Sequence, residues 1–116
     1  MALPELTQKL VESKLGTYCH NKIPAHLQQQ FRLSFSFWSN CVTLFEEREV
    51  HDTPGEWTKM PIAQFRLDVV DGLWRLYCAD LKRRDSWLRY QDVEPARDFE
   101  VLLGAMDLDR SGAFWG

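Results

Sequence analysis

The segment PIAQFRLDVVDGLWRLYCADLKRRDSWLRY, residues 61–90, decides the fold class of this chain. In residues 63–69 apolar side chains stand at every second position with polar ones between them, which is the period of a strand with one face in water. The pair Asp71-Gly72 then predicts a tight hairpin turn, because such turns need positive φ angles that these residue types tolerate. Residues 73–79 form the predicted return strand, and residues 86–90 a third strand after a charged loop. The segment therefore predicts an antiparallel meander.

Two further strands are predicted upstream of this meander. In residues 31–38 phenylalanine and leucine alternate with polar residues and one tryptophan, which predicts a strand with a phenylalanine-lined core face. The pair Ser39-Asn40 predicts a turn into a second strand, residues 41–49, in which both faces carry apolar side chains, as in a central strand. Residues 51–59 contain aspartate, proline and glycine and form a predicted loop of a length that often carries function.

Helices are predicted at both ends of the chain. Pro4 suits the first turn of a helix that runs to about Cys19, and the apolar residues of this segment spread over a wide arc that predicts packing across a sheet. They are Leu3, Leu6, Leu10, Val11, Leu15 and Tyr18. Near the other end, apolar residues spaced by three and four from Phe99 to Met106 predict a second helix with one apolar face. The order α-β-β-β-β-β-α predicts an α+β fold, a five-stranded antiparallel sheet with both helices packed on one face.

Length, charge and cysteine content indicate the class of protein. A chain of 116 residues is long enough to form one domain over residues 1–116 without disulfide bonds. Cys19, Cys41 and Cys78 are odd in number and lack C-x-x-C spacing, which favours reduced thiols and a cytoplasmic location. We expect no signal peptide and no membrane segment, because no run of about eighteen apolar residues occurs. The net charge of −3 gives no overall attraction to nucleic acid, so such binding would need a local patch.

Several motifs together resemble a known family. VTLFEERE at residues 42–49, PGEWTKMPIAQFR at 54–66, LWRLY at 73–77, WLRY at 87–90 and FWG at 114–116 are similar, in order and spacing, to the family catalogued as domain of unknown function 3024. The resemblance spans nearly the whole chain. It implies a bacterial, single-domain, intracellular protein and no activity, and no catalytic or binding residue can be carried over from the family.

A group of carboxylates with one histidine stands at the end of the second predicted strand and in the loop that follows. Such residues can carry out acid–base chemistry, so an enzyme hypothesis places a site at Glu46, Arg48, His51 and Asp52. Alternation along the strand sends Glu47 to the face opposite Glu46, so at most half of the group can converge. The simpler interpretation is an ion pair between Glu46 and Arg48 with the other side chains in solvent.

No metal and no other cofactor is predicted. Cys19, His20 and His26 have no companion ligands at a recognised spacing. Residues 107–112, DLDRSG, reproduce the first half of a calcium loop after an apolar helix, but the sequence ends at Gly116, before the position that should supply a bidentate glutamate. The simpler interpretation is a helix that ends with a glycine turn.

The sheet face opposite the phenylalanines is the predicted binding surface. Alternation places cationic and aromatic side chains there: Arg32, Trp38, Arg66, Arg75, Tyr77, Trp87 and Arg89. We expect Arg66, Arg75, Tyr77, Trp87 and Arg89 to make the contacts, because arginine prefers planar anions and every cation in the predicted strands is arginine. Three uses of this face stay open: binding a nucleic acid, nucleotide or acidic protein segment, forming a homodimer, or covering aromatic rings with arginine stems in solvent.

A binding module is the preferred function, because its residues meet on one surface without special geometry. The small enzyme with Glu46, Arg48, His51 and Asp52 is the alternative. Phe114 and Trp115 form a final apolar pair, and an exposed pair of this kind would leave a sticky patch. We therefore expect this tail to dock on the core.

Overall fold

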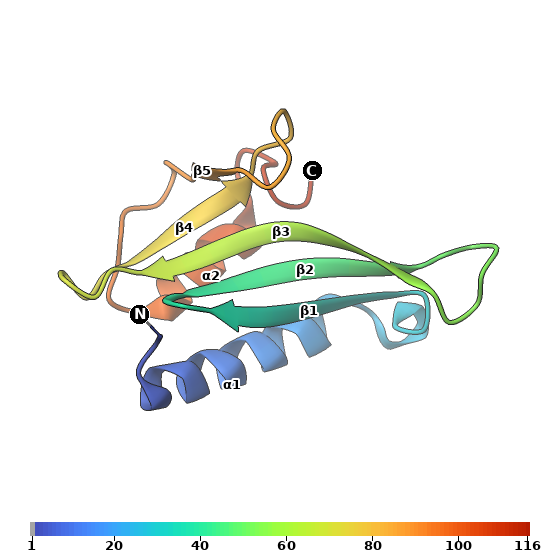
Figure 1. The fold of residues 1–116 in the computed structure, drawn as a ribbon, viewed down its shortest axis with the longest axis horizontal. Coiled ribbons are helices and arrows are strands. Elements are labelled where there is room, and N and C mark those ends of the chain that lie inside the picture. Colours follow the sequence, from blue (N-terminus) through green and yellow to red (C-terminus); the bar gives the residue numbers. More distant parts are fainter. Residues whose placement is uncertain (1) are drawn as a thin grey trace.

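The computed structural model describes residues 2–116, which form one open antiparallel sheet with a helix near each end of the chain (Figure 1). In chain order the elements are α1 (Glu5–Lys22), a 3-10 turn η1 (Ala25–Leu27), β1 (Phe31–Trp38), β2 (Cys41–Glu49), β3 (Trp57–Leu67), β4 (Trp74–Ala79), β5 (Trp87–Arg89) and α2 (Phe99–Leu108). The strand order β1-β2-β3-β4-β5 follows the sequence, and each strand is antiparallel to the next. The predicted α+β fold and its element order are confirmed.

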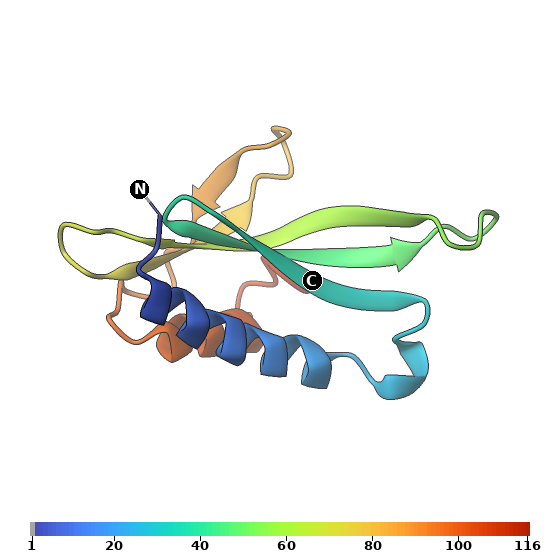
Figure 2. The same cartoon turned by 60° about the horizontal axis from the view of Figure 1, so that its bottom comes forward.

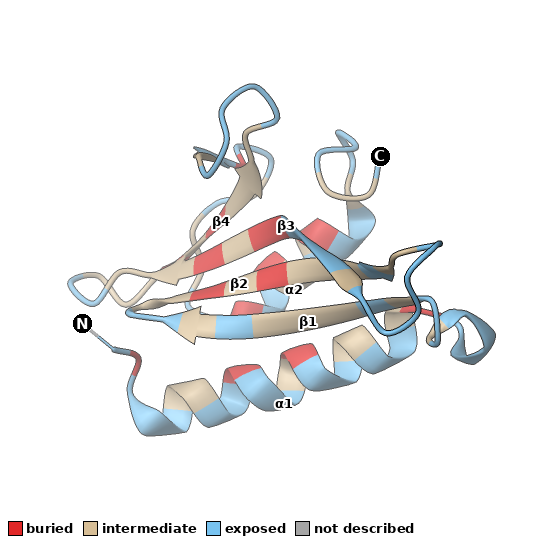
Figure 3. Ribbon diagram, turned by 45° about the vertical axis from the view of Figure 1, so that its right-hand side comes forward, coloured by how far each residue is buried: buried red, intermediate tan, exposed pale blue. Residues whose placement is uncertain are grey.

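Both helices cover the same face of the sheet, as Figure 2 shows. Register pairs such as Leu44 with Ala63 and Phe65 with Leu76 place the fully buried strand residues on that face. Val11 and Leu15 of α1 and the apolar side of α2 join them in one core cluster, and Figure 3 shows the buried residues where helices and strands meet. Within residues 2–116 no helix lies over the opposite face of the sheet.

The third strand begins earlier than the sequence pattern predicts. Trp57, Thr58 and Lys59 belong to β3, and the loop before it is only residues 50–56, closed by a hydrogen bond of 2.7 Å from Val50 N to Glu56 O. Pairing explains the difference, because Lys59 lies opposite Glu47 and Trp57 lies opposite Glu49. Cross-strand pairs of opposite charge stabilise a ladder that the local sequence does not reveal.

The connection between β3 and β4 is longer than the predicted tight turn. It spans residues 68–73 and is closed by a hydrogen bond of 3.0 Å from Asp68 N to Leu73 O. Gly72 has φ +71°, as a turn residue should, but Asp71 does not have a positive φ. The two aspartates instead act through their carboxylates, since Asp68 accepts a bond from Val70 N and Asp71 from Leu73 N.

The apolar arc predicted on α1 is only partly buried. Val11 and Leu15 are inaccessible and Tyr18 is half-buried, whereas Leu6 and Leu10 are 82% and 52% exposed. The cause is the position of α1 under the edge strand β1 rather than under the middle of the sheet (Figures 1 and 2). In the described part of the chain β1 is the last strand on this side, so no strand covers the outer side of the helix.

Polar contacts join α1 to α2. Lys14 Nζ donates to Glu100 Oε1 at 2.5 Å, and further along Tyr18 Oη and Lys22 Nζ donate to Asp107 Oδ1 at 2.9 and 3.0 Å. The hydrogen bond from Lys22 is the main reason that the pKa of Asp107 lies below its usual value, and burial raises the pKa of Tyr18. The two helices are therefore joined through two carboxylates of α2, Glu100 and Asp107.

Asp107→Asn should destabilise the protein near pH 7 and have little effect in acid. Because the pKa of Asp107 is lowered by folding, its stabilising effect is present above the unfolded pKa of about 4 and is lost as the pH falls through the folded pKa. Thermal melts of both proteins at pH 7 and near pH 3 would measure this. Asp52→Asn, in the exposed loop, is the matched control; a difference in melting temperature that is equal at both pH values would contradict the prediction.

Candidate binding face

The five predicted site residues lie together on the open face of the sheet. In the register Arg66 of β3 stands opposite Arg75 of β4, Tyr77 opposite Arg89 of β5, and Trp87 opposite Ala79. Residues that stand opposite each other in an antiparallel sheet project from the same face. We call the group Arg66, Arg75, Tyr77, Trp87 and Arg89 the arginine face.

Arg75 is neutralised by the loop that precedes its strand. Its Nη2 lies 2.8 Å from Asp71 Oδ2 and its Nη1 lies 3.5 Å from Asp68 Oδ2. The hydrogen bond from Arg75, followed by the one from Leu73 N, keeps the pKa of Asp71 below its usual value. Arg75 therefore supports the β3–β4 connection, and its charge is not free for a partner.

Arg66 and Arg89 carry no such partner. Arg66 Nε donates to Gln64 Oε1 at 2.6 Å, and its guanidinium carbon lies 3.8 Å from the centre of the Tyr77 ring. Arg89 is exposed on the short strand β5. Within residues 2–116 neither arginine is within ion-pair distance of a carboxylate. Arg66 therefore makes a cation–π contact with Tyr77, and the second uncompensated arginine, Arg89, stands opposite Tyr77 in the neighbouring strand.

The rest of the open face holds two cation–ring contacts that the sequence did not predict. Arg32 lies 3.9 Å from the ring centre of Trp57, and Lys59 lies 4.3 Å from that of Phe45. Glu47 pairs with Arg32 at 3.1 Å, and the neighbouring Ser34 side chain and then Arg32 lower the pKa of Glu47. The observed strand β3 contains Lys59. The prediction that every cation in the strands is arginine is therefore wrong. Glu47 therefore compensates Arg32 directly, whereas Arg66 and Arg89 over β3–β5 have no carboxylate partner within residues 2–116.

Comparison with known protein families shows to which family this chain belongs. The sequence profile of the family described as domain of unknown function (DUF3024) matches residues 3–116. The chain belongs to the DUF3024 family. No curated protein and no solved structure matches this DUF3024 chain. The family description carries no activity, so any function must be argued from the site itself.

The acidic group of this DUF3024 protein does not converge. Glu46 forms an ion pair with Arg48, as the simpler interpretation predicted, and both share the helix-side parity of Val42 and Leu44. His51 and Asp52 are exposed in the loop. Neither side chain forms a hydrogen bond or ion pair within residues 2–116. Glu46 and Arg48 therefore pair with each other, but no contact within residues 2–116 joins them to His51 or Asp52.

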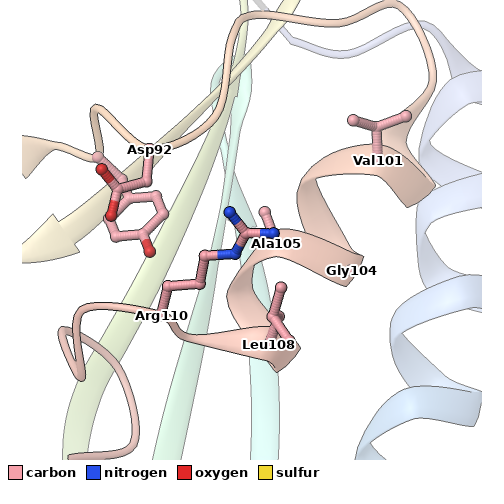
Figure 4. A pocket seen from close by; sticks show the side chains of 7 residues that line it. Asp92, Val101, Gly104, Ala105, Leu108 and Arg110 are labelled. Carbon is pink, nitrogen blue, oxygen red and sulfur yellow. The ribbon is translucent and has the colours of Figure 1, made fainter.

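A hollow lies beside α2 near the C-terminal end of the chain. It has a volume of about 280 Å³ and is lined by Tyr90, Asp92, Val101, Gly104, Ala105, Leu108 and Arg110 (Figure 4). Asp92 and Arg110 reach it from the segments after β5 and after α2. Its polar side chains are these two and the Tyr90 hydroxyl, and none of the predicted site residues lines it.

The carboxylates of the DLDRSG motif bind protein donors. Asp107 accepts from Tyr18 and Lys22, and the two oxygens of Asp109 accept from the backbone N–H groups of Phe114 and Trp115 at 3.1 and 2.7 Å. Helix α2 ends at Leu108, with Asp109 in the left-handed conformation. Over residues 2–116 no group of three histidine, cysteine or acidic side chains is arranged to hold a metal ion. In the same region no helix is long and apolar enough to cross a bilayer.

Proposed function

We propose that this DUF3024 protein is a binding module that takes an anionic partner on its arginine face. One observation carries the proposal: Arg66 is stacked on Tyr77 without a carboxylate neighbour, while Arg75 directly opposite is neutralised by Asp68 and Asp71. A guanidinium that lies over a ring and has no carboxylate partner can bind a planar anion, because its fork of donors matches phosphate or carboxylate oxygens.

The surroundings of Arg66 favour an extended anionic ligand over a small enclosed one. Arg89 lies across the strand from Tyr77, and Trp87 lies two positions before Arg89 on the same face. Phosphates or carboxylates can pair with the two arginines while a base or an apolar side chain stacks on the rings. Such binding needs an open sheet face and no deep pocket. Single-stranded nucleic acid and an acidic protein segment both have this chemistry.

Reversing both free charges should abolish most of the binding. We expect Arg66→Glu with Arg89→Glu to raise the Kd for a fluorescein-labelled single-stranded oligonucleotide or a glutamate-rich peptide at least tenfold, about 1.4 kcal/mol. Arg83→Glu with Arg84→Glu, on exposed residues of the β4–β5 loop, makes the same change in net charge and should alter the Kd less than twofold. Fluorescence anisotropy at fixed ionic strength measures both, with thermal melts to show that each variant folds.

The two probes also separate the partner classes. Nucleic-acid binding should weaken steeply with added salt, because neutralised phosphates release counterions. If both double variants bind equally well, or if wild-type protein binds neither probe up to millimolar concentration, the proposal fails. The loop around His51 and Asp52 is then the next surface to test.

A further inference from the structure

The outer edge of β1 lacks the features that usually protect an edge strand. β1 has eight residues with one charged side chain, no proline and no register shift against β2. Long, regular edge strands present unpaired backbone groups and are templates for another strand. The other edge differs: β5 has three residues, and Ala96 beyond it covers the remainder of β4 through two backbone bonds with Trp74, of 2.8 and 3.1 Å.

The hydrogen-bond pattern between β1 and β2 shows which backbone N–H and C=O groups of β1 point away from the sheet. Trp38 and Cys41 flank a two-residue turn, and at the other end Glu49 N donates to Gln30 O at 3.0 Å. Even-numbered residues of β1 therefore bond to β2, because bonded and non-bonded pairs alternate in an antiparallel ladder. The N–H and C=O groups of Leu33, Phe35 and Phe37 point away from the sheet. Outside the ladder no backbone hydrogen bond within residues 2–116 reaches them.

A groove runs along this edge between β1 and the C-terminal half of α1. Its volume is about 370 Å³, and its lining residues are Gly16, Cys19, His20, Ile23, Gln28, Arg32, Leu33 and Phe35. A Cβ atom placed on Gly16 would have no heavy atom within 4 Å, so the floor of the groove is open there. Side chains of a strand paired with β1, opposite Leu33 and Phe35, would project toward this space.

We infer that an extended peptide segment of another protein adds to β1 as a sixth strand. Its backbone would pair with Leu33, Phe35 and Phe37, and its alternate apolar side chains would fill the groove above Gly16. Most of the lining is apolar, no carboxylate lines the groove, and Arg32 is already paired with Glu47, so the groove suits a neutral segment with alternating apolar side chains. This surface is separate from the arginine face.

A second copy of the chain fits this edge less well than a single strand. Helix α1 runs along the outer side of β1 beneath the edge, as Figures 1 and 3 show. Pairing two β1 strands about a two-fold axis would bring a second α1 into the space under the same two strands. A peptide strand carries no helix and avoids this overlap.

Filling the groove should block the peptide without harming the fold. We would select peptides from a random twelve-residue display library on the wild-type protein and measure the Kd of each enriched peptide for Gly16→Leu. The expected result is alternating apolar sequences whose affinity falls at least tenfold in this variant. Gly104→Leu on α2 is the matched control, since Gly104 also has open space and gains the same helix propensity; its affinity should equal that of wild type.

Amide hydrogen exchange adds a readout that a change in stability would not mimic. The amides of Leu33, Phe35 and Phe37 should exchange fast in the free protein and slowly with the selected peptide, while Arg32, Ser34 and Ser36 are protected in both states. The Arg66→Glu and Arg89→Glu double variant should keep this peptide binding, so the two proposals fail independently. Failure to enrich such sequences, equal binding by Gly16→Leu, or protection that rises with protein concentration alone would overturn the inference.

Discussion

Removing residues 114–116 should lower the melting temperature by about 10 °C or more. Phe114 packs on Tyr90 with ring centres 4.9 Å apart, and Trp115 is half-buried against the core with Lys22 Nζ 4.9 Å from its ring centre. The deletion also leaves the Asp109 carboxylate without its two backbone donors. Loss of two large apolar contacts together with a capped turn costs several kcal/mol, which is a large part of the stability of a domain of this size.

Thermal unfolding followed by circular dichroism measures this effect. Removing Gly116 alone is the control, because this exposed residue contributes no side chain to the core. An unchanged melting curve after the longer deletion would mean that the tail does not stabilise the core. It would then have to be considered a free C-terminal segment.

The strand pattern of the sequence was informative wherever alternation and turn chemistry agreed. Residues 31–38 and 41–49 were predicted with the bounds that β1 and β2 have, because a period of two on both sides of Ser39-Asn40 leaves one register. The same parity argument placed Arg66 and Tyr77 on the open face. Local patterns suffice for these features because they depend on neighbouring residues of one hairpin.

Features that depend on distant partners could not be predicted. The sequence of residues 57–59 is typical of a loop. These residues form a strand only because they pair with β2. Leu6 and Leu10 have the spacing of core residues, yet they are exposed because α1 lies under the edge of the sheet. The sequence also could not show that Arg75 is neutralised while Arg66 is free, because this depends on how the 68–73 connection directs its two carboxylates.

Phe99→Ala should destabilise the protein by about 3–5 kcal/mol. Phe99 is 2% exposed at the start of α2, and its ring centre lies 4.7 Å from that of Phe65 and 5.1 Å from that of Trp74. Truncation would remove the contacts that join α2 to β3 and β4 and leave a cavity between them. Urea unfolding gives the free energy; Val101→Ala, on the same helix but 49% exposed, should lose less than about 1 kcal/mol.

The same variant tests how the arginine face depends on the core beneath it. Phe65 and Trp74 each precede an arginine of that face, Arg66 and Arg75, which projects to the opposite side of the sheet. If the sheet keeps its register without Phe99, the folded fraction should bind an anionic probe with the Kd of wild type. A loss of stability similar to that of Val101→Ala would contradict the central position of this ring. A Kd that rises in the fully folded variant would instead show that α2 helps to hold β3 and β4 in the geometry that the partner needs.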